Sequence, residues 1–154
     1  MNIEQYDGDR EVLRPFFRLA DDSEQQIDAD LKRGDVLVAD DDGELVGQVQ
    51  VVAGRERIWE LTSLAVIESR RGEGIGRLLV DAAVRHCRQQ EAVRLLVATA
   101  AADIGNLRFY QRQGFRMLCI ERDAFGAAAG YPDGIVIDGI PLLDRVWFDQ
   151  EFSA

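Results

Sequence analysis

The feature that most constrains this chain is the glycine-rich segment RRGEGIGR at residues 70–77. It follows an apolar run of strand length and precedes a long amphipathic helical pattern. Glycines at alternate positions, Gly72, Gly74 and Gly76, allow neighbouring backbone N–H groups to turn toward one ligand, and the start of a helix adds the positive end of its dipole. The segment therefore indicates a phosphate site. A flexible turn that needs small residues explains the glycines about equally well.

Three common nucleotide motifs do not fit this segment. A Walker A loop requires Gly-Lys-Ser/Thr, whereas Gly76 is followed by Arg77 and Leu78. The dinucleotide fingerprint G-x-G-x-x-G fails because Arg77 stands where its last glycine would be. A kinase glycine loop joins two strands, whereas a helical pattern follows here. Ordinary P-loop, dinucleotide and kinase chemistry are therefore excluded.

Hydrophobic periodicity along the chain predicts a mixed α/β sheet with helices on both faces rather than a doubly wound parallel sheet. Pro15 is expected to distort the first helix, the acidic turn at 40–43 to close a hairpin, and residues 126–134 to form a mobile loop. The expected helices are about 10–19, 23–33, 74–89 and 103–113, and the expected strands are about 35–39, 45–53, 57–66, 93–98, 115–121 and 140–148.

Length, charge and cysteine usage limit the class of protein. The chain has 154 residues, so we expect one domain over 1–154. Its formal net charge of -10 repels a phosphate backbone, which argues against nucleic acid as a partner. There is no apolar stretch of 18 residues and no apolar run at the amino terminus, so we expect no membrane partner and a cytoplasmic location. Cys87 and Cys119 lie in apolar stretches without CxxC spacing, and we expect both to be core residues rather than a metal or redox pair.

A second block gives the loop a more specific interpretation. Residues 64–66 (LAV), the loop at 71–76 (RGEGIG) and residues 109–115 (FYQRQGF) closely resemble the GNAT superfamily of N-acetyltransferases. The loop matches that family's R/Q-x-x-G-x-G/A motif, and the last block matches its Y-x-x-x-G-F motif. The resemblance is strong over about residues 61–116 and weak over the whole chain. It implies a GNAT-like acyl-CoA N-acyltransferase fold of the α/β (α+β) class, with a mixed, mostly antiparallel central sheet of about six to seven strands and helices on both faces.

The resemblance implies a role for each matching position. The main chain of Leu64, Ala65 and Val66 would hold the pantetheine arm of acetyl-CoA. Tyr110 would be the general acid that protonates the departing thiolate, a role that a phenol of pKa about 10 can perform. The pyrophosphate would be bound by the loop and the start of the helix, namely by Arg71, Gly72, Gly74, Ile75, Gly76 and Arg77.

The chain departs from the family at one position. Many members carry an asparagine several residues before the tyrosine, where it contacts the cofactor arm, but residues 100–103 are AAAD here. Asn106 lies four residues before Tyr110, one helical turn away on the same face. Asn106 either replaces the missing asparagine as a cofactor-binding residue or is an ordinary polar helix residue. We slightly favour the second interpretation, an ordinary polar helix residue.

The base that would deprotonate an amine is less well defined. Glu60 lies on the strand that leads to Leu64, where the family often has a glutamate. A sheet residue that faces solvent explains Glu60 equally well. His86, the single histidine, lies far in sequence from both motifs and is expected to be a surface or flanking residue rather than a catalyst. The acidic excess and the turn at 40–42 are consistent with a cationic amine, although solubility explains them as well.

We therefore expect an N-acetyltransferase that moves the acetyl group from acetyl-CoA to a primary amine by direct attack in a ternary complex. Tyr110 would be the acid, Glu60 or a water relay the base, acetyl-CoA a co-substrate, and no metal is expected. The alternative is a non-catalytic acyl-CoA-binding regulatory module on the same fold. A structural or interaction protein is disfavoured by the intact loop and by Tyr110.

The sequence does not identify the acceptor, which would be a small-molecule or peptide amine, and it leaves a homodimer undecided. The second half also resembles a bacterial subgroup of the family, through Gly114-Phe115-Arg116, Asp123, Phe125 and Tyr131-Pro132. That finer resemblance is weak evidence for the substrate.

Overall fold

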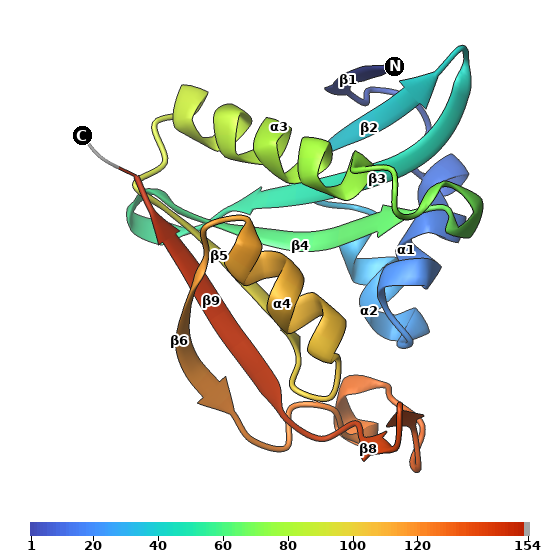
Figure 1. The fold of residues 1–154 in the computed structure, drawn as a ribbon, viewed down its shortest axis with the longest axis vertical. Helices are drawn as coiled ribbons and strands as arrows, with labels where there is room; N and C mark the ends of the chain where they lie inside the picture. Colours follow the sequence, from blue (N-terminus) through green and yellow to red (C-terminus); the bar gives the residue numbers. More distant parts are fainter. Residues whose placement is uncertain (153–154) are drawn as a thin grey trace.

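A seven-stranded sheet lies between two pairs of helices (Figure 1). The computed structural model describes residues 1–152, so the last two residues of the expected domain lie outside the described part. In chain order, with η for a 3-10 helix, the elements are β1 (Asn2–Gln5), η1 (Arg10–Leu13), α1 (Arg14–Ala20), α2 (Glu24–Asp30), β2 (Asp35–Asp41), β3 (Glu44–Ala53), η2 (Arg55–Arg57), β4 (Ile58–Val66), η3 (Glu68–Arg70), α3 (Ile75–Gln89), β5 (Arg94–Ala100), α4 (Ile104–Arg112), β6 (Arg116–Glu121), η4 (Ala127–Ala129), β7 (Val136–Ile137), β8 (Ile140–Pro141) and β9 (Arg145–Glu151).

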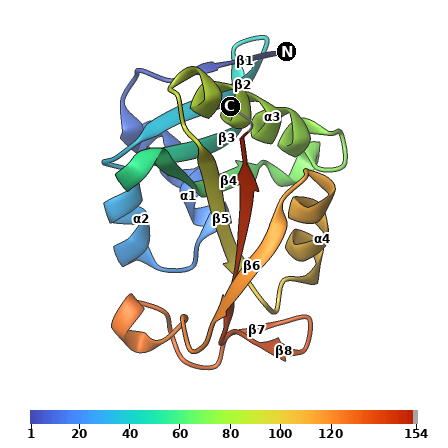
Figure 2. The same ribbon diagram turned by 90° about the vertical axis from the view of Figure 1, so that its left-hand side faces the viewer.

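The strand order of the sheet is β1-β2-β3-β4-β5-β9-β6, and β7 pairs with β8 in a separate hairpin. Neighbouring strands are antiparallel except for β4 and β5, which run parallel. The expected mixed, mostly antiparallel sheet is therefore confirmed. The last long strand, β9, inserts between β5 and β6, a position that the order of elements along the chain does not reveal (Figure 2).

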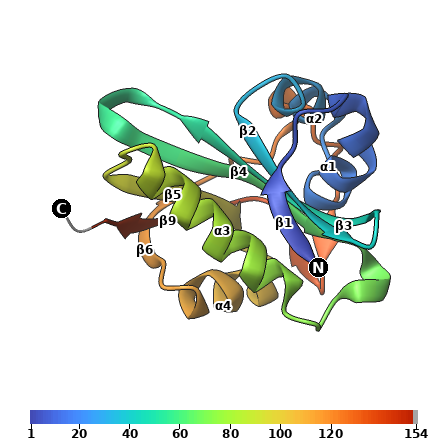
Figure 3. The ribbon, with the colours of Figure 1, turned by 90° about the horizontal axis from the view of Figure 1, so that it is seen from above.

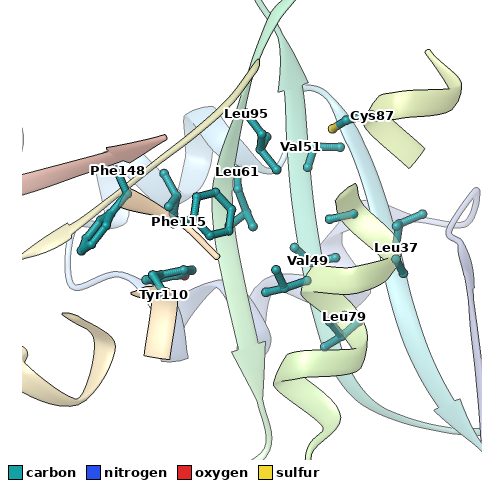
Figure 4. Close-up of a cluster of buried hydrophobic side chains, with 14 of the residues drawn as sticks. Leu37, Val49, Val51, Leu61, Leu79, Cys87, Leu95, Tyr110, Phe115 and Phe148 are labelled. Atoms are coloured by element: carbon teal, nitrogen blue, oxygen red, sulfur yellow. The ribbon is translucent and has the colours of Figure 1, made fainter. Parts of the chain in front are cut away.

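The helices cover both faces of the sheet, as expected (Figure 3). On one face, α3 and α4 bury a core that includes Leu61, Leu79, Cys87 and Tyr110 (Figure 4). On the other face, α1 and α2 bury a second core whose fully enclosed members include Leu13, Phe17, Ile27 and Leu31. Burial of each large apolar side chain favours folding by about 1.5–3 kcal/mol, so both layers hold the sheet in place. None of the helices in the described residues combines the length and the apolar character that a membrane span needs.

The two elements that carry the family motifs form where the sequence predicts them. The pattern expected at 74–89 folds as α3, and its apolar positions Ile75, Leu79, Ala83 and Cys87 are buried against the sheet. The helix expected at 103–113 folds as α4, with Asp103 as its N-cap. The Asp103 carboxylate accepts a hydrogen bond from the Asn106 backbone N–H at 2.9 Å, which satisfies one of the free donors of the first turn.

Two expected elements are divided in the structure. The helix expected at 10–19, with a distortion at Pro15, is divided into η1 and α1. This agrees with the expected distortion, because Pro15 lies in the first turn of α1, where its missing N–H is not needed. The expectation of one strand at 140–148 is wrong. The N–H of Leu142 donates to the carbonyl of Ile135 at 2.9 Å, which keeps β8 in the small hairpin, and β9 begins only at Arg145.

The expectation that both cysteines are core residues is half wrong. Cys87 is buried, but Cys119 is exposed. The reason is the position of β6 at the edge of the sheet, where all six of its residues are exposed. The apolar composition of this strand therefore does not correspond to burial.

The segment expected as a mobile loop, 126–134, is anchored in the structure. It contains η4, and the buried Tyr131 donates its hydroxyl hydrogen bond to Asp21 at 2.6 Å. The Ser23 hydroxyl donates to the carbonyl of Ala129 at 2.9 Å. These two bonds attach the segment to the start of α2.

β4 contains a bulge at the point where its pairing with β5 ends. Gln50 pairs with Ser63 and Val51 with Leu61, so Thr62 is an extra residue in β4. The parallel pairing of β4 with β5 runs only from Ile58 to Leu61, whereas β4 continues to Val66. The two strands therefore separate in the middle of the sheet.

Candidate functional site

A cavity of about 840 Å³ lies where β4 and β5 separate. The twelve site residues expected from the sequence come from β4, the glycine loop, α3 and α4, and every one of them lines this cavity. They are Glu60, Leu64, Ala65, Val66, Arg71, Gly72, Gly74, Ile75, Gly76, Arg77, Asn106 and Tyr110.

The glycine loop leads directly into α3 and leaves its N-terminus open. Gly72 and Gly74 have φ values of +82° and +83°, a conformation that favours glycine, and Gly74 is the N-cap of the helix. A Cβ atom added at either glycine would meet no atom within 4 Å. The first helical hydrogen bond joins the Leu78 N–H to the Gly74 carbonyl, so the amides of residues 75–77 have no acceptor within the helix. This arrangement suits a phosphate group.

The arginines of the loop differ in what they contact. The Arg70 guanidinium forms ion pairs with Asp41 at 2.9 Å and Glu73 at 3.0 Å. The exposed Arg71 instead donates from Nε to the carbonyl of Val66 at 3.2 Å, which places its guanidinium beside the end of β4. Arg77 is exposed in the first turn of α3. Arg71 and Arg77 are therefore better placed than Arg70 to meet an anion.

The end of β4 has one edge without a strand partner. Gly47 and Gln48 of β3 pair with Val66 and Ala65 on one side. The pairing with β5 on the other side has already ended at Leu61. The backbone groups of residues 64–66 on that side can therefore pair with an extended ligand as a strand would, consistent with the arm-holding role that the resemblance implies.

Tyr110 is held rigidly by α4 and the core. It is 6% exposed, and its ring packs edge-on against Phe109 and Phe115 at centroid distances of 5.1 and 5.8 Å. Burial, and to a lesser degree the charge of Asp103, raises the pKa of the Tyr110 phenol. The phenol is therefore protonated at neutral pH, which is the state that a proton donor needs.

Asn106 also lines the cavity, on the first turn of α4. Its Nδ2 donates to the Thr99 hydroxyl at 3.2 Å, which links α4 to the free end of β5. This contact gives Asn106 a structural role and places it at the cavity wall. The two interpretations of this residue, cofactor contact and ordinary helix residue, both stay open.

Glu60 is partly buried at the cavity wall rather than directed into open solvent. Burial is the main cause that raises the pKa of its carboxyl group, and Asp30 raises it further. Arg33 and Arg145, which line the same cavity, act in the opposite direction. A carboxyl group with a raised pKa is better matched to accepting a proton near neutral pH than an ordinary one.

The sequence did not identify the residues that line the cavity beyond Glu60. This part is formed by α1, α2 and the segment 122–147. It includes Asp21, Asp30, Arg33, Phe125, Tyr131 and Arg145. Of these residues, the sequence analysis singled out only Phe125 and Tyr131, through the resemblance to a bacterial subgroup. That resemblance did not assign them to a site.

Two other candidates lie outside the cavity. His86 does not line it and contacts Asp35, with 2.9 Å between Nε2 and the carboxylate. No cluster of three or more His, Cys, Asp or Glu side chains that could hold a metal ion occurs within residues 1–152.

Comparisons with known proteins agree with this geometry. The sequence pattern of the Acetyltransferase (GNAT) family matches residues 6–115. An uncharacterized N-acetyltransferase of Bacillus subtilis, YvbK, is 30% identical over 146 residues, which are 95% of this chain and 93% of that protein. A Bacillus subtilis acetyltransferase solved in complex with CoA has a TM-score of 0.89 and 29% identity, covering 98% of each chain. A GNAT family acetyltransferase from Elizabethkingia anophelis, solved with acetyl-CoA bound, has a TM-score of 0.90 and 25% identity, covering 98% of this chain and 97% of that one. The chain belongs to the GNAT acetyltransferase family.

Proposed function

We propose that this protein transfers the acetyl group of acetyl-CoA to a primary amine by direct attack in a ternary complex. The observation that carries the proposal is that one cavity joins an open helix N-terminus, a free strand edge, a protonated phenol and a carboxyl group of raised pKa. Two solved relatives, one with CoA and one with acetyl-CoA, support the choice of acyl donor.

The chain's own groups fit this co-substrate. The free amides of residues 75–77 and the guanidinium groups of Arg71 and Arg77 would bind the pyrophosphate. The backbone of residues 64–66 would hold the pantetheine arm along the free edge of β4. Both contacts would bring the thioester to the gap between β4 and β5, in the cavity that Tyr110 and Glu60 also line.

Two proton transfers complete the proposed reaction. Glu60, directly or through a water molecule, accepts a proton from the ammonium group, because only the neutral amine has the lone pair that attacks the thioester carbon. As the new C–N bond forms and the C–S bond breaks, Tyr110 donates its proton to the departing sulfur. The products are the acetylated amine and CoA with a free thiol.

The test is release of CoA thiol from acetyl-CoA on addition of amines, with mass spectrometry of the acetylated product. Amine-dependent thiol release supports the proposal. Tight binding of acetyl-CoA with no transfer to any amine would favour the alternative, a non-catalytic acyl-CoA-binding module. Cytoplasmic location and the absence of nucleic acid and membrane partners stay predictions, as does a homodimer.

A further inference from the structure

The part of the cavity beyond Glu60, which we call the acceptor end, contains several charged groups that bind one another. Asp21 accepts the hydroxyl hydrogen bond of Tyr131 at 2.6 Å. Asp30 accepts from Arg33 at 2.8 Å and from Gln26 at 3.1 Å. These bonds hold α2 and the segment around Tyr131 together. All of them are accepted by Oδ1, so the Oδ2 atom of each aspartate has no hydrogen-bond partner within residues 1–152.

Glu60 and Arg145 are two further groups of opposite sign at the acceptor end, and both are partly buried, whereas Asp22, which also lines it, is exposed. Glu60 has no ion pair or side-chain hydrogen bond among the contacts of residues 1–152, although it lines the cavity. The Arg145 guanidinium has one long contact, 3.4 Å to Glu121, whose side chain is 46% exposed. Glu121 also accepts the indole N–H of Trp147 at 3.0 Å. Because a guanidinium has five N–H donors, most of those of Arg145 are free for another acceptor.

Arg145 is also held in a defined position. It begins β9, beside Ala100 at the end of β5. Its guanidinium carbon lies 4.8 Å from the centre of the Phe125 ring and 6.0 Å from that of Trp147, and both rings line the cavity. Arg145 itself lines the cavity, as do Glu60 and Tyr131, and its charge lowers the pKa values of both.

We propose that the acceptor amine also carries a carboxylate, and that Arg145 binds this carboxylate while the amine faces Glu60. The inference rests on the proposed acetyl transfer and adds the class of acceptor, an amino carboxylate. A planar guanidinium with free parallel N–H groups matches a carboxylate in a bidentate arrangement. Beside Arg145 the same positive charge repels an ammonium group, so a diamine whose second ammonium group reaches Arg145 fits less well than an amino carboxylate of similar length.

The test compares matched acceptors and matched variants. The probes are glycine, leucine, β-alanine and 4-aminobutanoate, each beside its carboxamide, together with 1,4-diaminobutane. The readout is kcat and KM for the amine at saturating acetyl-CoA. We expect the carboxylates to have kcat/KM values about ten- to a hundred-fold above those of the best carboxamide and of the diamine, the value of a charged hydrogen-bonded pair. The chain length preferred by the parent protein then measures the distance between Arg145 and the thioester.

Variants separate recognition from folding. Arg145→Gln should raise the KM of the preferred carboxylate at least ten-fold more than the KM of its carboxamide, because an effect through the pKa of Glu60 is common to both acceptors. Arg145→Lys keeps the positive charge but not the two parallel N–H donors of the guanidinium. It should therefore recover part of the carboxylate binding that Arg145→Gln loses. The control is Arg116→Gln, which replaces an exposed arginine on β6. It should leave the kinetics with both acceptors unchanged. Thermal melting of each variant records any loss of packing against Phe125.

Three outcomes would overturn the inference. Equal use of carboxylates and carboxamides by the parent protein contradicts it and leaves the proposed acetyl transfer intact. An equal loss with both acceptors in Arg145→Gln assigns Arg145 a structural role. Transfer to no amine at all, by a protein that binds acetyl-CoA, contradicts the proposed function and the inference with it.

Discussion

Leu61 and Val97 form the last pair of the parallel ladder between β4 and β5, and beyond them the two strands separate inside the sheet. The separation leaves backbone donors and acceptors of residues 64–66 without a strand partner. Unpaired backbone groups in the middle of a sheet are costly unless a ligand or water satisfies them. The gap therefore offers main-chain groups that an extended ligand can pair with, as the proposed function requires, and Tyr110 and Glu60 line the same cavity.

Gly74→Val should lower the affinity for acetyl-CoA at least ten-fold, because a branched side chain at the N-cap of α3 would stand where the pyrophosphate meets the helix. The loss of one or two charged hydrogen bonds of about 1.5–3 kcal/mol each accounts for this magnitude. Isothermal titration of the folded variant measures it.

The control for this variant is Gly139→Val. Gly139 has a φ of +82° in the β7–β8 turn, and an added Cβ meets nothing within 4 Å, as at Gly74. Both variants therefore carry a similar backbone strain of about 1–3 kcal/mol. Equal cofactor affinity in the two variants would mean that the loop does not bind the pyrophosphate.

Tyr110→Phe should lower kcat at least ten-fold and leave the KM for acetyl-CoA little changed, since general acid catalysis contributes about 100- to 10,000-fold. The ring is retained, so its packing against Phe109 and Phe115 is retained as well. Tyr6→Phe removes another phenol, one that donates to the Asp9 carbonyl outside the cavity, and should leave kcat unchanged. If Tyr110→Phe has the full kcat of the parent, Tyr110 is not the general acid and the departing thiolate takes its proton from solvent.

The part of the cavity that is formed by the glycine loop, α3 and α4 could be predicted because its structural requirements are local. A left-handed N-cap needs glycine at 74, and the start of an amphipathic helix and the block around Tyr110 can be read from a few neighbouring residues. The same holds for the hairpin at 40–43, where Asp42 and Gly43 both have positive φ. Each of these features depends on residues adjacent in the chain.

The acceptor end could not be predicted because long-range contacts create it. Asp21 and Tyr131 are 110 positions apart, and their hydrogen bond depends on how the segment 122–144 crosses the open end of the sheet. Arg145 reaches the cavity only because β9 inserts between β5 and β6. The exposure of Cys119 has a similar origin, since the same insertion leaves β6 at the edge.

The two cysteines should differ strongly in reactivity. Burial, with a smaller effect of Asp35, raises the pKa of the Cys87 thiol to about 12, whereas Cys119 is exposed on β6. A thiol reagent at pH 8 should therefore modify Cys119 quickly and Cys87 only on unfolding, because the thiolate is the reactive form. Peptide mapping by mass spectrometry identifies the modified residue. Rapid labelling of Cys119→Ser in its native state would contradict the burial of Cys87.

Glu60→Gln tests the proposed base through two properties that respond to pH in opposite ways. Burial raises the pKa of Glu60, so the stability linked to this carboxyl is fully present below its ordinary pKa and is lost as the pH rises through the folded-state value. The glutamine variant carries no charge to bury. It should therefore melt at the same or a higher temperature than the parent at neutral pH, and the advantage should disappear in acid.

At neutral pH, Glu60→Gln should lower the activity although it does not lower the melting temperature. Without the carboxylate, kcat/KM for the amine should fall at least ten-fold near neutral pH, and raising the pH should restore much of it because more of the amine is already neutral. Glu44→Gln, an exposed residue at the start of β3, is the matched control. An equal loss at every pH would point to binding of the ammonium group rather than to proton transfer. If kcat/KM of Glu60→Gln depends on pH as it does in the parent, Glu60 is not the base. An amide cannot accept the proton, so replacing the base with glutamine must change this pH dependence.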